Sequence, residues 1–498
     1  MKILFTVPIS KERFNVIPDL GLGYLASCAR EAGHVAGILD CVLDRCDLDG
    51  FGRRVAAFKP DVLGLKVYSC DIGTAREMLR WVRHNYPDTV SVVGGPHPSC
   101  EHATDLFNQL PDLNYAFAGE AEPGFVRFLE RITAGKKDME GVPGILWKSG
   151  NGMVQVNAKA SVEDLDALPF PAWDLMDPRR YTCGYSFITT KLPAAPMALT
   201  RGCPFSCTFC GSHLITGRRV RKRSLDNIIE EIKLLQHSYG VRTIDIVDEN
   251  LAFDREFVIA FCERLLQENL GIAWNCPYGV RLNSLDETVV RSMARAGCFG
   301  LSVGVESGSP RILEAIRKNL SVEDVIEKVR MIKRVTDMTL QGYFMMGFPE
   351  ETREDIEASI RLACSLPFDL VTFCPLRVTP GTEVYETLQA AGRIPRELDY
   401  RGLGHHYFVR SYCSVPDDEM RRLYRKAYLS FYSRPRIIWS LFRRLRSWSH
   451  VKTIVNGLRR MLYSPKHPQR EQGPFTPPAN SSHESKAHDE AGQGVKAE

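Results

Sequence analysis

The 498-residue sequence predicts an α/β protein with two sheet-centred domains. The first is an N-terminal doubly wound, Rossmann-like parallel sheet. The second is a (β/α)6 partial TIM barrel, followed by a helical C-terminal region and a disordered tail. Short apolar runs alternate with helical stretches over most of the chain, which is typical of parallel sheets covered by helices. The apolar fraction of 44% and the charged fraction of 25% are those of a globular protein.

Five short apolar runs in residues 1–160 are the candidate strands of the first domain. They are Ile3–Val7, Val35–Leu39, Val62–Val67, Val90–Val93 and Tyr115–Ala118. Helical patterns separate them, and ligands bind such sheets at the carboxyl ends of the strands. Glycines there let the backbone approach a ligand closely, so several such loops at one edge favour a large planar cofactor. No G-x-G-x-x-G follows the first strand, which argues against a dinucleotide.

Six further strand candidates, each followed by a helical pattern, lie in residues 191–395. They are Met197–Thr200, Thr243–Val247, Ile272–Asn275, Gly300–Val305, Leu340–Met346 and Leu370–Pro375. Six βα repeats predict a partial barrel, because a complete one has eight, and barrel chemistry sits at the carboxyl ends of the strands. The proline-containing segment 161–190 is expected to be a linker between the two domains.

A loop after the first barrel strand carries Cys203, Cys207 and Cys210 with C-x3-C-x2-C spacing. Thiolates this close on one loop can share a metal centre, and sulfur ligands favour iron–sulfur clusters or zinc. A [4Fe–4S] cluster normally takes four cysteines, so three would leave one iron open. Structural zinc remains an alternative for the loop alone, because His213 could complete a Cys3His set. The remaining cysteines, of 15 in all, are scattered, which favours a reducing cytoplasm over a secreted disulfide framework.

The cysteine loop, the Gly94–His97 loop, the Gly119–Glu122 loop and the helix start at Leu20–Tyr24 together resemble the cobalamin-binding radical S-adenosylmethionine (SAM) enzymes. The resemblance covers about residues 1–395 and implies three cofactors: a [4Fe–4S] cluster, SAM and cobalamin. It implies that a 5′-deoxyadenosyl radical activates the substrate and that methylcobalamin delivers a methyl group to an unactivated carbon. The enzyme would then be a cobalamin-dependent C-methyltransferase.

The resemblance also implies site residues. The expected cluster ligands are Cys203, Cys207 and Cys210. The expected SAM contacts are Phe209, Asp248, Glu249, Asn250, Glu306, Ser307 and Gly347. The expected cobalamin contacts are Pro8, Ser69, Gly94, Gly95, Pro96, His97 and Glu120. None of the 12 histidines has Asp two residues before it, so the cobalt-ligating D-x-H-x-x-G motif is absent.

Two of these assignments leave alternatives open. The run Asp248–Asn250 is not the common Gly-Gly-Glu form, so any of its three residues could accept from the amino group of SAM. Phe209 could lie near the adenine or simply pack the cysteine loop. His97, flanked by prolines, is expected to shape its loop or to contact the edge of the cofactor.

The C-terminal part is expected to be helical over residues 396–463 and disordered over 464–498, where apolar residues almost disappear. Residues 434–462 carry basic residues, no acid and an apolar stripe. That pattern favours either a membrane surface or an acidic partner, or packing on the barrel with the arginines in water. No membrane span, signal peptide or nucleic-acid signature is recognisable, so we expect a cytoplasmic protein that binds no nucleic acid, with a peripheral place on the inner membrane face as the alternative that the basic stripe offers.

The expected partners are a small-molecule substrate and an external electron donor of the flavodoxin or ferredoxin type. Aromatic residues near the barrel strand ends, Tyr278, Phe344 and Phe373, favour a lipid, terpenoid or tetrapyrrole-like substrate. A radical SAM cyclase or rearrangement enzyme that uses cobalamin is the alternative within the family. A non-catalytic zinc- or cofactor-binding interaction protein is the alternative from another class.

Overall fold

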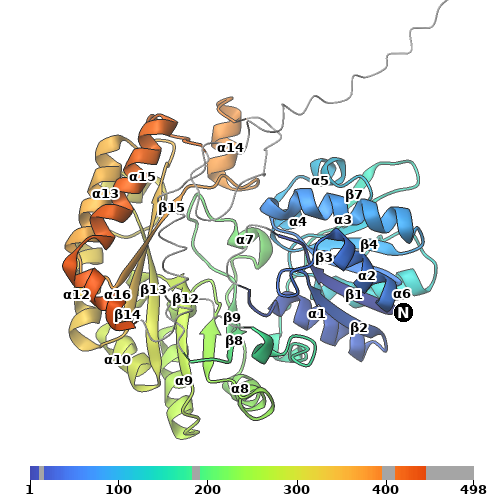
Figure 1. The fold of residues 1–498 in the computed structure, drawn as a ribbon, viewed down its shortest axis with the longest axis horizontal. Helices are drawn as coiled ribbons and strands as arrows, with labels where there is room; N and C mark the ends of the chain where they lie inside the picture. The colour runs from blue at the N-terminus through green and yellow to red at the C-terminus, as the bar shows by residue number, and fades with distance from the viewer. Residues whose placement is uncertain (11–15, 182–190, 395–409, 445–498) are drawn as a thin grey trace, which may run out of the picture.

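The computed structural model describes residues 1–10, 16–181, 191–394 and 410–444. Two sheet-centred units lie side by side, and the short helix α7 (Ser212–Ile215) lies between them (Figure 1). The expected tail 464–498 and most of the expected basic helix 434–462 fall outside the described residues. No helix in the described part of the chain is long and apolar enough to cross a membrane.

The N-terminal unit is built on a seven-stranded sheet in the order β2-β1-β3-β4-β5-β6-β7. The first five strands are parallel, while β6 and β7 add an antiparallel hairpin at the edge. The expected Rossmann-like sheet is confirmed. Its order 2-1-3-4-5 places the switch point, where ligands bind, between β1 and β3. The strands are β1 (Lys2–Val7), β2 (Val35–Asp40), β3 (Val62–Lys66), β4 (Val90–Gly94), β5 (Tyr115–Phe117), β6 (Ile145–Lys148) and β7 (Val154–Val156).

Helices cover both faces of this sheet, and the first two begin after capping aspartates, Asp19 and Asp47. Asp19 caps the first helix by accepting a hydrogen bond from the backbone N–H of Leu22. One helix, α4, occupies the Pro96–Cys100 segment that the sequence analysis treated as a loop, because proline fits the first turn of a helix. The helices are α1 (Leu20–Glu31), α2 (Leu48–Phe58), α3 (Ile72–Asn85), α4 (Pro96–Cys100), α5 (Ala103–Gln109) and α6 (Glu122–Thr133).

The second unit is the expected partial barrel, with six parallel strands in the order β8-β11-β12-β13-β14-β15. A two-stranded antiparallel ribbon, β9 and β10, brackets the cysteine loop. The strands are β8 (Ala194–Met197), β9 (Thr200–Arg201), β10 (Arg221–Lys222), β11 (Thr243–Ile246), β12 (Ala273–Val280), β13 (Cys298–Glu306), β14 (Thr339–Met346) and β15 (Leu370–Pro375). The covering helices are α8 (Leu225–Tyr239), α9 (Arg255–Gln267), α10 (Glu287–Arg295), α11 (Pro310–Ala315), α12 (Val322–Val335), α13 (Arg353–Ser365) and α14 (Glu383–Ala390).

Helix α15 (Asp417–Tyr432) covers the open edge of the barrel at β15. The Tyr428 hydroxyl donates to the carbonyl of Phe373 at 3.0 Å and accepts from its N–H at 3.2 Å. The Tyr432 hydroxyl does the same for Val371, at 2.8 and 3.2 Å. These two hydroxyls take the place of a seventh strand, because backbone groups at a buried edge need partners.

The segment before the barrel is more than a linker. Trp173 is 2% exposed and lies in the barrel core, where its indole N–H donates to Glu231 Oε1 at 2.9 Å. Short 3-10 turns flank it at Leu165–Ala167 and Pro178–Arg180. The prolines that suggested a linker exclude regular helix and strand here, but they do not prevent burial of a large aromatic side chain.

Candidate functional site

The cysteine loop is held at its start by a glycine that no other residue could replace without strain. Gly202 has φ of +98°, and a Cβ at this position would lie 2.2 Å from the carbonyl oxygen of Arg219. Its backbone N–H donates to Glu249 Oε2 at 3.2 Å, and Glu249 Oε1 accepts from the Thr216 hydroxyl at 2.8 Å. Glu249, at the end of β11, therefore links the two ends of the loop.

Asp248 holds the strand that leads into the loop. Its buried carboxylate accepts from the N–H groups of Leu199 and Thr200, at 2.8 and 2.9 Å, and from the Thr200 hydroxyl at 2.8 Å. Burial raises the pKa of Asp248 to about 7. Both carboxylate oxygens of Asp248 are already used by these hydrogen bonds. Asp248 therefore positions the Leu199–Thr200 backbone and does not offer a free hydrogen-bond acceptor.

The three loop cysteines are free thiols and all are half-buried. Burial raises the pKa of Cys203, and the thiols of Cys210 and Cys207 raise it further because thiolates at these positions repel each other. Among the described residues, no three His, Cys, Asp or Glu side chains converge as one metal ion requires. Three thiols on one loop are a donor set that fits a [4Fe–4S] cluster, which is held by cysteine thiolates.

A fourth cysteine, missed by the sequence analysis, lies beside the loop. A Cβ at Gly211 would be 3.6 Å from Sγ of Cys100, which belongs to α4 of the other unit. The Lys159 ammonium joins the same two units, because it donates to the carbonyls of Ser99 and Leu214, both at 2.9 Å. Burial raises the pKa of Cys100 to about 11. The only signal in the sequence was its position three residues after His97 of the Gly-Gly-Pro-His segment.

Apart from Phe209, the expected SAM residues lie at the carboxyl ends of the barrel strands β11, β13 and β14. Glu306 ends β13 with φ of +69°, an unfavourable backbone for glutamate, and its carboxylate pairs with the Lys318 ammonium at 2.7 Å. Both side chains are buried. The Ser307 hydroxyl is buried against that of Ser359 at 3.2 Å. Gly347, with φ of +100°, continues the same edge after β14.

Phe209 and Asn250 differ in the contacts that they make near these strand ends. Phe209 packs edge-on against Phe348, with ring centroids 5.6 Å apart, so the structure shows the loop-packing alternative for this residue. Asn250 Oδ1 accepts from the backbone N–H of Arg281 at 3.3 Å. Its amide nitrogen is buried and has no hydrogen-bond partner in the described part of the chain. Asn250 is therefore the member of the 248–250 run with spare hydrogen-bonding capacity.

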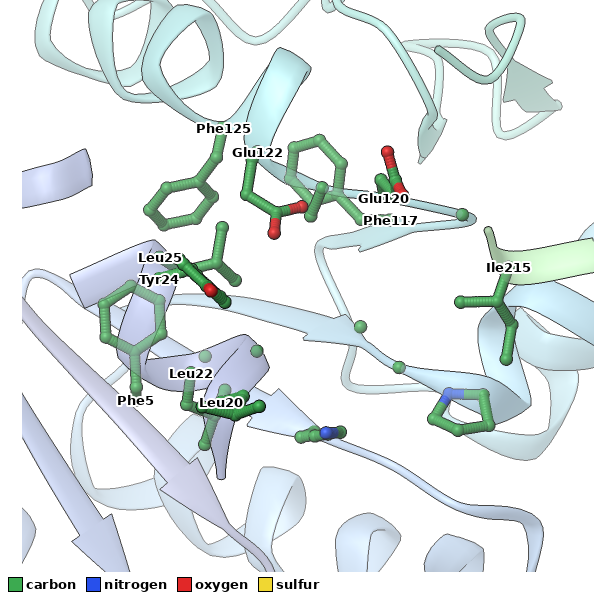
Figure 2. Close-up of a pocket in the computed structure, with 18 of the residues that line it drawn as sticks. Phe5, Leu20, Leu22, Tyr24, Leu25, Phe117, Glu120, Glu122, Phe125 and Ile215 are labelled. Atoms are coloured by element: carbon green, nitrogen blue, oxygen red, sulfur yellow. The ribbon is translucent and has the colours of Figure 1, made fainter. Parts of the chain in front are cut away.

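An apolar cavity opens at the carboxyl ends of β1, β3, β4 and β5 and reaches across to the barrel (Figure 2). In Figure 2, Glu122 of α6 points toward its middle, while Ile215 of the barrel unit lies across from Phe5 and Tyr24. Of the expected cobalamin residues, Gly94, Gly95, Pro96 and Glu120 line the cavity. Pro8, Ser69 and His97 do not belong to the lining.

His97 is a structural residue of the loop. It is 1% exposed, and its ring nitrogens hydrogen bond with Ser69 Oγ at 3.0 Å and with Gln109 Oε1 at 2.8 Å. Burial lowers the pKa of His97. The expectation that His97 shapes its loop agrees with these contacts, and Ser69 contributes to the same network.

Ion pairs connect the cavity with the cysteine loop. Arg201, two residues before Cys203, donates to Glu122 Oε1 at 3.0 Å and lies over the Tyr24 ring at 5.1 Å. Glu120 forms a two-point pair with Arg221 of β10, at 2.7 and 2.8 Å. The sequence analysis missed Arg201 and Arg221, because nothing local to either residue shows which carboxylate it will meet.

Comparisons with known proteins agree with this arrangement. Residues 8–129 match the family described as B12 binding domain, and residues 197–363 match the Radical SAM superfamily. A protein of Pyrococcus horikoshii described as an uncharacterized methyltransferase is 29% identical over 93% of this chain and 99% of its own. Cytidylyl-2-hydroxyethylphosphonate methyltransferase of Streptomyces wedmorensis is 27% identical over 77% and 80%.

A solved structure shows the same fold. The cobalamin-dependent SAM radical enzyme OxsB, solved with aqua-cobalamin and SAM bound, has a TM-score of 0.72 at 17% identity. The match covers 93% of this chain and 75% of that one. A B12 binding domain followed by a radical SAM domain defines the class. The chain belongs to the cobalamin-binding radical SAM enzymes.

Proposed function

We propose that this enzyme transfers a methyl group to an unactivated carbon of a small-molecule substrate, using a [4Fe–4S] cluster, SAM and cobalamin. One observation carries the proposal: residues on both sides of the cysteine loop line the cavity. Arg201, just before Cys203, and Ile215, just after Cys210, both line the cavity formed by the N-terminal sheet. A radical made at the loop and a methyl group held in the cavity would then act on the same substrate.

The chain's own residues have distinct tasks in this scheme. Cys203, Cys207 and Cys210 would hold the cluster, while Glu306 and Asn250 offer hydrogen-bonding groups to SAM. Bound cluster and SAM supply a carbon-centred radical, and cobalamin supplies the methyl group. The apolar walls of the cavity exclude water, which protects reactive species.

Cobalamin would bind here without a histidine on cobalt. The cavity is lined by no His, Cys or Met among the described residues. His97 is already bonded through both ring nitrogens. Gly95 has φ of +99°, and a Cβ at this position would lie 2.9 Å from Lys66 Cγ. Because glycine has no side chain, the backbone here can lie close to the end of β3. These features support a cofactor that Gly94, Gly95 and Pro96 would hold against the strand ends.

The substrate class and the partners belong to the proposal too. Of the three aromatic residues that favoured an apolar substrate, Phe344 and Phe373 are fully buried and pack on each other, so they cannot contact it. Tyr278 remains 54% exposed at the end of β12, which supports a lipid, terpenoid or tetrapyrrole-like substrate. We also infer a cytoplasmic enzyme that takes electrons from a flavodoxin- or ferredoxin-type donor.

Helix α16 (Pro435–Arg444) supports a peripheral membrane contact. Ile438 and Trp439 are 54% and 62% exposed, next to Arg434 and Arg436. Exposed apolar side chains beside arginines suit an anionic bilayer surface. Sedimentation with vesicles containing anionic lipid, and its loss in Trp439→Ala, would support the contact; equal sedimentation of both proteins would remove it.

Anaerobic reconstitution tests the proposed function. The protein is supplied with iron, sulfide and hydroxocobalamin, then reduced in the presence of SAM, and 5′-deoxyadenosine is measured. We expect about four irons per chain, bound cobalamin and 5′-deoxyadenosine from the wild type. The variant with Cys203, Cys207 and Cys210 changed to Ala should form none, whereas Cys364→Ala, a half-buried cysteine outside the loop, should match the wild type. One bound zinc and intact SAM would overturn the proposal.

A further inference from the structure

Arg281 is a buried cation whose surroundings offer it no carboxylate. It follows β12 and is 8% exposed. A buried guanidinium normally pairs with an acid, because burying an uncompensated charge is costly. Yet in the part of the chain that the structure describes, Arg281 forms no ion pair. The two nearby cations are both satisfied: Lys318 pairs with Glu306, and Arg317 pairs with Glu383.

The guanidinium of Arg281 instead lies against the cysteine loop. Its Nη1 donates to Sγ of Cys207 at 3.5 Å, and its plane covers the Phe205 ring with 3.7 Å to the centroid. Its Nη2 donates to the carbonyl of Lys318. Three contacts from three directions therefore fix the plane of the guanidinium, and one of them is a candidate cluster sulfur.

The surrounding chain is built to keep this geometry. Arg317 and Asn319 both have positive φ, +53° and +50°, on either side of Lys318. The Lys318 side chain is held by the buried carboxylate of Glu306. The same segment accepts a hydrogen bond from the loop itself, from Thr208 N to the carbonyl of Ile316 at 3.3 Å. Strained backbone on both sides of one carbonyl indicates that its position matters.

We propose that Arg281 is a positioning residue that sets the reduction potential of the cluster through Cys207. The missing counter-charge of the guanidinium is then the thiolate sulfur of the cluster. One electron from the external donor enters the cluster and makes it more negative by one charge. A cationic hydrogen-bond donor on a ligating sulfur stabilises that reduced state more than the oxidised one, so it raises the potential. This inference rests on the cluster of the proposed function.

The test is a potentiometric titration of the reconstituted holoenzyme without SAM, with the reduced cluster followed by electron paramagnetic resonance. Arg281→Gln keeps a donor group but removes the charge, so its potential should fall. At the wild-type midpoint potential, we expect its ratio of reduced to oxidised cluster to drop about tenfold or more, equivalent to about 59 mV per tenfold for one electron. Arg281→Lys keeps the positive charge but loses the two-pronged guanidinium. Its reduction potential should therefore lie between those of the wild type and Arg281→Gln.

Arg317→Gln is the matched control, because it removes a guanidinium of the same segment that pairs with Glu383 and keeps the Arg317 carbonyl that accepts from Sγ of Cys207. Its ratio should stay within about threefold of the wild type, or roughly 30 mV. An unchanged potential in a fully loaded Arg281→Gln variant would overturn the inference while leaving the proposed function intact. An equal shift in Arg317→Gln, or loss of the cluster in both Arg281 variants, would also overturn it, since either result denies a specific effect through Cys207. Failure of the wild type to form any cluster would instead refute the proposed function.

Discussion

The Glu120–Arg221 pair provides the sharpest test of how the two units are joined. Glu120 follows β5 of the N-terminal sheet, and Arg221 lies in β10 of the barrel unit. Both side chains are 3% exposed. Their two hydrogen bonds are 2.7 and 2.8 Å long, and Arg221 also donates to the carbonyls of Val162 and Thr216. The guanidinium is thus fully enclosed and relies on Glu120 for its charge balance.

Replacing Glu120 with Gln removes that balance while nearly preserving shape. Opposite unit charges about 4 Å apart interact by about 4 kcal/mol at an effective dielectric constant near 20. Breaking a buried pair by removing one partner costs about 3–5 kcal/mol for the same reason. We therefore expect Glu120→Gln to lower the free energy of unfolding by about 3–5 kcal/mol. Glu163→Gln breaks an exposed pair with Arg219, and there the change should be at most about 1 kcal/mol.

Urea unfolding at pH 7, followed by both circular dichroism and tryptophan fluorescence, gives the measurement, with free energies taken where the two transitions coincide. A double variant with Met at both 120 and 221 should recover part of the loss, because no charge is then left buried. A change below about 1 kcal/mol in Glu120→Gln would refute the reasoning. It would mean that water or local relaxation compensates the guanidinium, since Arg201, the other cation near Glu120, cannot.

Two further predictions concern other buried groups. Burial raises the pKa of Glu351 to about 8, from an ordinary value of 4.5. The native state thus binds more protons than the unfolded chain between those values, and stability should fall as pH rises from about 5 to 8. Glu351→Gln should flatten the pH dependence of the urea midpoint, and parallel profiles would contradict this. Tyr428→Phe leaves the N–H and carbonyl of Phe373 unpaired at the barrel edge and should cost about 1–3 kcal/mol. The exposed Tyr278→Phe should be neutral; equal effects in the two variants would argue against edge protection by α15.

Local sequence patterns predicted the strands and most of the helices correctly, because each depends on nearby residues. Apolar runs of the right length gave β1 to β5 and the six barrel strands, with ends shifted by a few residues. The cysteine spacing placed three thiols on one loop, since their closeness along the chain is a property of residues 203–210 alone. The α4 helix was missed because a short Pro-His-Pro segment is equally compatible with a turn.

The site shows that local sequence patterns cannot predict which distant side chains will meet. His97 and Asp248 have the residue types of cofactor ligands, but the fold surrounds each with hydrogen-bonding partners from distant segments. Arg281 carried no signal at all in the sequence. Its importance comes from the meeting of the end of β12 with the cysteine loop and the 316–319 segment.

The sequence by itself determined the two sheets and the loop that carries the thiols, because these follow from periodicity and spacing along the chain, while the enzyme class came from the resemblance of its motifs to a known family. The tertiary structure alone decided which charges meet. It joined Glu120 to Arg221, and Arg201 to Glu122, across the two units. It also placed Cys100 and Arg281 beside the cysteine loop. Burial and pairing of charges depend on residues far apart in sequence, and only folding brings those residues within a few ångströms.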